Sequence, residues 1–525
     1  MGKVSRRNML KLASATATAA ALSPASVAQL AGKRHDSVPV WECFEVSLDG
    51  PADGNPFTEI QLDATFTLDH REVRVNGFYD GEGKYRIRFM PDTFGVWRYH
   101  TTSNHRSLDG LAGEFQATAA LPGSHGPVGV CNTFHFAHAD GTPFFPFGTT
   151  CYAWIHQSEQ LQEQTLATLK TAPFNKLRMC VFPKHYEYNH NEPPFYPFVR
   201  DANGNNDLTR FNPAFFAHLE QRVANLRSIG VQADLILFHP YDRWGYASMP
   251  PEADDRYLRY IIARLAAYPN IWWSMANEYD LMKSKTVQDF DRFFRILEQY
   301  DPYRHLRSVH YSHTMYDYSR AWVTHASLQT SDFAAAPGFR TAWKKPVCYD
   351  EVQYEGNLNS RWGNLSGDEM ARRFWLGVIN GCYVTHGETY LAGPSNFDVN
   401  STPTLWWSHG GALHGSSPQQ IAFLRKLLED AMPSGTRVGL QPPDNPYYLN
   451  ASTVDAKTGQ AQTILYYLDY HQPVWYDFPL PEGTFSAELI DPQQGTFKPV
   501  NGRFSGKSKL ELTVRPYQAI RFRRL

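Results

Sequence analysis

Two acidic side chains follow short apolar segments of the kind that form buried parallel strands. Glu278 comes two residues after the run 271–276, and Glu351 comes two residues after the run 346–349. Desolvation beside so apolar a run raises the pKa of a carboxyl group and lets it hold a proton near neutral pH, as a general acid must. A second carboxyl group about 5 to 5.5 Å away allows a glycosidic bond to be cleaved through a covalent glycosyl-enzyme. The pair of acids therefore predicts a retaining glycosidase.

Each of these acids has a competing interpretation. Glu278 alone is compatible with an ordinary surface ion pair, although the end of an apolar strand is an expensive place for an idle carboxylate. Three other acids, Asp350, Glu355 and Glu388, are rivals of Glu351 for the role of the second carboxylate. A carbohydrate-binding protein with a degenerate barrel would retain the same fold without using either acid for turnover.

The elements that must position these acids lie in the segment 128–432, where short apolar runs alternate with helical stretches. The predicted strands are 143–150, 176–182, 233–239, 271–276, 306–311, 323–328, 346–349 and 383–385. The predicted helices are 158–171, 213–228, 254–267, 287–299, 368–379 and 418–431, and those between the fifth and seventh strands look short or irregular. This size and rhythm predict a (β/α)8 barrel, whose functional residues lie at the carboxyl ends of the strands. A doubly wound sheet is the alternative, but no strand is followed by G-x-G-x-x-G.

All-β segments flank the predicted barrel. Residues 36–122 alternate apolar and polar side chains between Asp-Gly and Pro-Asp turns, and the same alternation returns over 433–525. Period-two alternation with frequent turns predicts an N-terminal Ig-like β-sandwich and a C-terminal β-sandwich.

Taken together, these features resemble the cellulase-like clan of retaining (β/α)8 glycoside hydrolases. Members carry an Asn-Glu dipeptide on strand four and a second catalytic glutamate on strand seven. The resemblance implies that Glu278 is the acid/base, that Asn277 contacts the 2-hydroxyl of the substrate and that Glu351 is the nucleophile. The layout of β-sandwich, barrel and β tail is similar to bacterial members whose specificities are largely unassigned.

The resemblance also extends to two further strand ends. Arg178, near the end of strand two, occupies the position of an arginine that holds the nucleophile ionised, although a buried structural ion pair is the alternative. His239, which ends strand three, fits a frequent polar position of the clan. The His-x-Tyr that many members carry on strand six is not evident in 325–327, so substrate positioning is expected to differ.

Aromatic and polar side chains on the loops after the strands are expected to form the sugar site. Ring faces stack on the C–H face of a pyranose, and a few placed polar groups bind its hydroxyls. The long loop after strand two, 184–198, is expected to contribute to this site. The individual candidates are Trp154, Tyr241, Trp244, His313, His386, Glu388 and Trp406.

A metal-dependent barrel hydrolase is a third hypothesis, because zinc hydrolases with barrel folds also place histidines at strand ends. The histidines in question are His239, His310, His313 and His386. Strand one lacks an H-x-H motif, so we predict neither a metal site nor a cofactor. The six cysteines are too widely spaced for a zinc ribbon or a disulfide scaffold.

Composition limits the partners and suggests the compartment. The 525 residues carry 50 Lys and Arg against 52 Asp and Glu, so no basic field is available for nucleic acid. Residues 1–32 resemble a twin-arginine signal and leader, with Arg6 and Arg7 before an Ala-rich apolar stretch. That stretch is too short to span a bilayer. We therefore expect an exported protein, periplasmic or extracellular, with a carbohydrate substrate, no nucleic acid partner and no membrane span; the oligomeric state cannot be deduced.

Overall fold

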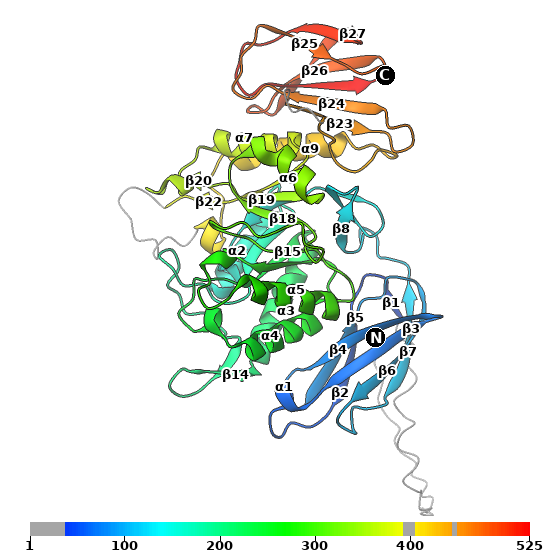
Figure 1. The fold of residues 1–525 in the computed structure, drawn as a ribbon, viewed down its shortest axis with the longest axis vertical. Helices are drawn as coiled ribbons and strands as arrows, with labels where there is room; N and C mark the ends of the chain where they lie inside the picture. Colours follow the sequence, from blue (N-terminus) through cyan, green and yellow to red (C-terminus); the bar gives the residue numbers. More distant parts are fainter. Residues whose placement is uncertain (1–36, 392–404, 444–448) are drawn as a thin grey trace, which may run out of the picture.

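The computed structural model describes residues 37–391, 405–443 and 449–525. They form an N-terminal β domain, a central barrel and a C-terminal β domain, and Figure 1 shows the two β domains on different sides of the barrel. The expected twin-arginine signal falls within residues 1–36, outside the described residues, and stays a prediction. No helix among the described residues is both long and apolar enough to cross a bilayer.

The central sheet has eight strands, and all of its pairs are parallel. Around the sheet they are β17 (Arg307–Ser308), β16 (Ile271–Ala276), β15 (Gln232–Phe238), β12 (Lys176–Cys180), β11 (Phe147–Thr150), β21 (Tyr383–His386), β19 (Val347–Glu351) and β18 (Ala326–Gln329). A parallel bridge between His310 and Ser327 joins the two ends of the sheet, so the barrel is nearly closed. The predicted (β/α)8 architecture is therefore confirmed.

The helices cover the outside of the barrel (Figure 1). They are α2 (Glu159–Leu169), α3 (Pro213–Ser228), α4 (Pro251–Leu265), α5 (Val287–Tyr300), α6 (Ala336–Trp343), α7 (Gly367–Ile379) and α9 (Ser417–Asp430). Capping residues fix several starts: Ser158 accepts from the backbone of α2, and Thr286 forms a capping box with Asp289 of α5. The described residues between β17 and β18 include no helix, whereas the sequence predicted a short or irregular one there. The helix between β18 and β19, α6, is short, as expected.

The barrel interior holds an ionic cluster between strands. Nζ of Lys176 lies 2.9 Å from Asp234 and 2.8 Å from Asp350, and Thr385 and Ser327 also donate to Asp350. Burial alone would raise the pKa of Asp350, but the charges of Lys176 and Arg178 hold that pKa well below its usual range. Asp350 is thus a buried structural carboxylate of the barrel.

The N-terminal β domain consists of seven strands with an aromatic core. They are β1 (Ser37–Pro39), β2 (Phe44–Asp49), β3 (Leu62–Leu68), β4 (Arg71–Tyr79), β5 (Lys84–Phe89), β6 (Gly95–Ser103) and β7 (Ala112–Thr118), with the short helix α1 (Pro56–Glu59) between β2 and β3. Strand β4 pairs with β3 and, over its last residues, with β5. It therefore belongs to both layers, which enclose Phe66, Trp97 and Phe115.

The C-terminal β domain has a five-stranded sheet and a two-stranded one. The larger comprises β23 (Asn450–Val454), β24 (Ala461–Tyr467), β29 (Ala519–Arg524), β26 (Phe485–Asp491) and β27 (Thr496–Phe504), and the smaller β25 (Trp475–Pro479) and β28 (Lys507–Glu511). It docks on α7, where Trp375 stacks on Tyr467 and Arg372 pairs with Asp469.

Short strands lie at both ends of the barrel. The sheet β8 (Val128–Cys131), β9 (His135–His138) and β10 (Pro143–Phe144) brings Phe136 against Trp272 at the amino-terminal end of the strands. Elements near the other end are β13 (Phe198–Arg200), β14 (Asn206–Phe211), β20 (Glu355–Gly356), β22 (Glu388–Thr389) and α8 (Trp406–His409). These connections surround the mouth of the barrel.

Candidate active site

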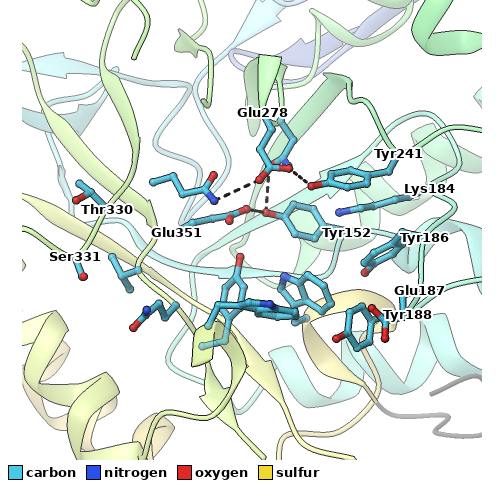
Figure 2. A pocket seen from close by; sticks show the side chains of 17 residues that line it. Tyr152, Lys184, Tyr186, Glu187, Tyr188, Tyr241, Glu278, Thr330, Ser331 and Glu351 are labelled. Atoms are coloured by element: carbon cyan, nitrogen blue, oxygen red, sulfur yellow. Dashed lines mark hydrogen bonds between the residues drawn. The ribbon is translucent and has the colours of Figure 1, made fainter. Parts of the chain in front are cut away.

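A cavity of about 660 Å³ opens at the carboxyl ends of the barrel strands. Its walls are rich in aromatic rings, and its floor carries two carboxyl groups (Figure 2). The lining residues are Tyr152, Lys184, Tyr186, Glu187, Tyr188, Tyr241, Asn277, Glu278, Gln329, Thr330, Ser331, Glu351, Val352, Gln353, Tyr354, Trp362 and Trp407. Flat apolar walls with a few polar groups suit a sugar.

Glu278 is held just beyond β16 in a left-handed backbone conformation, with φ of 49°. Such a conformation is costly for a residue with a Cβ, and it is concentrated at functional sites. The carboxyl group is buried and accepts hydrogen bonds from the hydroxyl of Tyr241, from Asn277 at 3.2 Å and from Gln329 at 3.3 Å. These three donors fix the carboxyl group so that it faces the cavity.

Glu351 ends β19 and faces the same cavity. Its carboxylate accepts a hydrogen bond from the hydroxyl of Tyr152, which also lies 3.1 Å from Oδ1 of Asn277 (Figure 2). Burial, followed by the nearby charge of Glu278, raises the pKa of Glu351 to about 7. The two carboxyl groups are therefore close enough to influence each other's protonation.

A cation lies in the wall beside the two acids. Nζ of Lys184 is 3.9 Å from the ring centroid of Tyr152 and 4.3 Å from those of Tyr186 and Tyr241. Ring faces attract a cation most strongly when it is desolvated, and Lys184 is only 2% exposed. Burial lowers the pKa of Lys184, while the charges of Cys180, Glu278 and Glu351 act in the opposite direction. Two of the tyrosines around this ammonium, Tyr152 and Tyr241, are the residues whose hydroxyl groups donate to Glu351 and Glu278.

The structure brings four of the predicted site residues together in the cavity: Asn277, Glu278, Glu351 and Tyr241. Arg178 lies beneath them, fully buried, with Nη2 3.5 Å from Oδ1 of Asn277.

Arg178 is surrounded by negative groups. Burial opposes its charge, but Asp350, Tyr152, Asp234 and Glu351 together raise its pKa. Its placement thus suits both the expected effect on Glu351 and the structural pairing that was the alternative.

Other predicted contacts lie outside the cavity lining. His239 is buried and bonds the carbonyl of Phe182 at 3.1 Å, and burial lowers its pKa to about 3. The indole of Trp154 is fully buried and donates to the carbonyl of Gln162. Both side chains are therefore buried against backbone carbonyl groups and do not line the cavity.

On the loop after strand eight, Trp406 was expected to contribute to the sugar site, but it does not line the cavity. Its indole is fully buried and donates to Thr149 at 2.8 Å, whereas the adjacent Trp407 lines the cavity. Trp244 is half-buried outside the cavity, with its indole 3.2 Å from Glu192.

The remaining candidates also fall outside the cavity lining. His313 is exposed, and its backbone N–H donates to Asp280. His386 and Glu388 are buried on the outer side of the barrel wall with Glu355, and within the described ranges they form the one group whose atoms are spaced like metal ligands. The histidines considered for a catalytic metal therefore do not converge on the cavity.

Several lining residues escaped the sequence reasoning. Tyr152 and Gln329 stand at or just after the ends of β11 and β18, where the strand-end rule could have found them. Tyr354 and Trp362 lie on the loop after β19, and no spacing in the sequence marks them. Their contribution depends on how that loop folds back over the barrel.

The fold and the site together are typical of glycoside hydrolases. A protein from Bacteroides vulgatus ATCC 8482, described as a candidate glycoside hydrolase, is 38% identical, with a TM-score of 0.85 over 93% of this chain and 100% of that chain. A family 5 glycoside hydrolase from the same organism superimposes with a TM-score of 0.58 over 78% of this chain and 95% of that one, at 16% identity. None of the curated proteins compared with the chain matches it.

Three family models match successive parts of the chain. The catalytic domain of the apiosidase-like family matches residues 131–433, more than half of the chain, and the chain belongs to that family. Two domains of unknown function, DUF5060 and DUF5605, match residues 37–104 and 452–523. The resemblance to cellulase-like glycoside hydrolases with extra N-terminal and C-terminal domains is thereby confirmed, and glycosidase activity is supported.

Proposed function

We propose that the protein is a retaining glycosidase in which Glu278 is the acid/base and Glu351 the nucleophile. The observation that carries the proposal is that the buried carboxyl group of Glu278, just beyond β16, and the half-buried carboxyl group of Glu351, at the end of β19, face one aromatic cavity. Each has a tyrosine hydroxyl as a fixed donor, Tyr241 for Glu278 and Tyr152 for Glu351. Groups held in this way retain one geometry through both steps of a double displacement.

Double displacement has two steps, and Glu278 and Glu351 supply every proton transfer and the nucleophile that these steps need. In the first, the carboxylate of Glu351 attacks the anomeric carbon while Glu278 transfers its proton to the leaving oxygen, which gives a glycosyl ester of Glu351 and the free aglycone. In the second, Glu278 takes a proton from water as the water oxygen attacks the anomeric carbon and releases Glu351. We assign to Asn277, which lines the cavity next to Glu278, the contact with the 2-hydroxyl of the sugar.

Removal of the nucleophile provides the test. We expect Glu351→Ala to lose turnover of an aryl glycoside by more than about 10³-fold and azide to restore part of it, with a glycosyl azide as product. The substrate is chosen from aryl glycosides, including apiosides, and plant polysaccharides that the wild type cleaves. Glu187→Ala, an acid of the same cavity without these contacts, is the matched control and should remain active. Full activity in Glu351→Ala would refute the assignment.

A further inference from the structure

Three buried side chains outside the cavity form a second cluster of titratable groups. His386 ends β21, Glu388 begins β22, and Glu355 begins β20. The parallel pairing of β20 with β22 sets Glu355 directly opposite Glu388. One donor atom from each of the three side chains lies within 4.8 Å of the others, and all three are at most 1% exposed.

The two carboxylates are held by neutral donors. Within the part of the chain that the structure describes, neither Glu355 nor Glu388 forms an ion pair with lysine or arginine. Four backbone N–H groups, from the turn before α9 and from its first residue, donate to them: His414 and Gly415 to Glu388, and Ser416 and Ser417 to Glu355. The hydroxyl of Tyr390 also donates to Glu355, at 3.3 Å. Buried carboxylates are usually paired with a cation or coordinate a metal, because burial of their charge is otherwise expensive.

The third member has an unused nitrogen. Nδ1 of His386 lies 3.0 Å from Oγ1 of Thr149, which also accepts the indole N–H of Trp406. Nε2 of the fully buried His386 has no hydrogen-bond partner. With Nδ1–H donating to Thr149, Nε2 presents a lone pair, and this division of roles is how proteins orient a metal-binding imidazole.

We propose that Glu355, Glu388 and His386 bind a divalent transition-metal ion, with Zn²⁺ as the best match. One imidazole nitrogen and two carboxylate oxygens are ligands that Zn²⁺ accepts, and water completes its coordination. The ion neutralises the two carboxylates and links the ends of β20, β21 and β22. Because Tyr354 precedes Glu355 and lines the cavity, the ion stiffens one wall of the active site from behind without contact with substrate.

Metal binding to the full-length protein without a histidine tag tests the site. Protein stripped with a chelator is titrated with ZnCl2, MnCl2 or CaCl2; metal content is measured by mass spectrometry, affinity by calorimetry, and unfolding temperature in parallel. We expect one Zn²⁺ per chain, a higher unfolding temperature with Zn²⁺, and weaker binding of Ca²⁺. His386→Gln and Glu388→Gln should each lower the affinity by more than about 10-fold.

His156→Gln is the matched control, because His156 is equally buried and also has an unpartnered Nε2 but belongs to no such cluster. It should lose stability yet bind Zn²⁺ as the wild type does. Absence of stoichiometric Zn²⁺ binding by the wild type overturns the proposal, and so does unchanged binding by a folded His386→Gln or Glu388→Gln variant. If neither variant folds, the wild-type stoichiometry and the shift in its unfolding temperature decide. None of these readouts depends on catalysis.

Discussion

Tyr152 connects the two acids of the cavity, because its hydroxyl donates to Glu351 and lies beside Asn277, which donates to Glu278. A hydrogen bond to a charged group contributes about 1.5–3 kcal/mol, so we expect Tyr152→Phe to lower kcat/KM by about 10- to 100-fold. Tyr186→Phe is the control, since the hydroxyl of Tyr186 donates to Ser408 and not to an acid. Steady-state kinetics on both variants give the comparison, and equal losses would argue against a special role for Tyr152.

The proton on the acid pair sets the expected pH dependence. Burial and the charge of Glu278 raise the pKa of Glu351 to about 7, so the pair releases its last proton near pH 7. Double displacement needs one proton on the pair, and kcat/KM should therefore fall about tenfold per pH unit above pH 7. Tyr152→Phe removes a hydrogen bond that lowers the pKa of Glu351, so its alkaline limb should move to higher pH. A wild-type profile that stays flat to pH 9 contradicts this prediction.

Among the elements, the barrel strands depend on an internal ionic cluster. Lys176 of β12 is 1% exposed and neutralises Asp234 of β15 and Asp350 of β19. Lys176→Met leaves both carboxylates buried with Arg178 as the remaining cation, which should lower the free energy of unfolding by about 3–5 kcal/mol. Urea unfolding of this variant is compared with the exposed Lys170→Met, which should stay within about 0.5 kcal/mol of wild type. Similar midpoints for the two variants would show that the cluster contributes little.

Most of the elements could be predicted from sequence because their signals are local. Strand 271–276 and helix 213–228 have the predicted bounds, since an apolar run and a Pro-initiated amphipathic stretch define them within their own residues. The prediction was least certain between the fifth and seventh strands, because β17 has only two residues and no helix lies between it and β18 among the described residues.

The site was predictable only in part, for a geometric reason. Glu278, Glu351 and Asn277 stand at strand ends, where the barrel alone determines their direction. For Trp406 and Trp407, adjacent in sequence, the orientation depends on how α8 packs, and composition does not tell which ring faces the cavity. His386 and Glu388 are two residues apart, so their side chains lie on the same side of the extended backbone. That side is the outside of the barrel, and neither side chain lines the cavity.

At the scale of the whole molecule, the N-terminal β domain is joined to the barrel through Glu220 of α3. Its carboxylate binds Arg88 of β5 at 2.7 Å and Arg264 of α4 at 2.5 Å, and both arginines are at least nine-tenths buried. Arg264 also pairs with Asp80 at 2.7 Å. The junction is therefore a buried ionic network, and its stability depends on every charge having its partner.

Glu220→Gln should loosen this junction without affecting the cavity, whose lining comes from other segments. Two buried guanidinium groups lose their shared carboxylate, so we expect the N-terminal domain to unfold at a lower temperature, with a loss of about 3–5 kcal/mol. Scanning calorimetry and limited proteolysis measure this change, while kcat at 25 °C should stay within about twofold of wild type because the acids keep their donors. The matched control is Glu163→Gln, which removes the ion pair between Arg222 and Glu163, whose side chain is 56% exposed. Such surface pairs contribute about 0–1 kcal/mol to the free energy of unfolding. If Glu220→Gln unfolds like Glu163→Gln, the buried carboxylate of Glu220 contributes no more to the junction than a surface pair does.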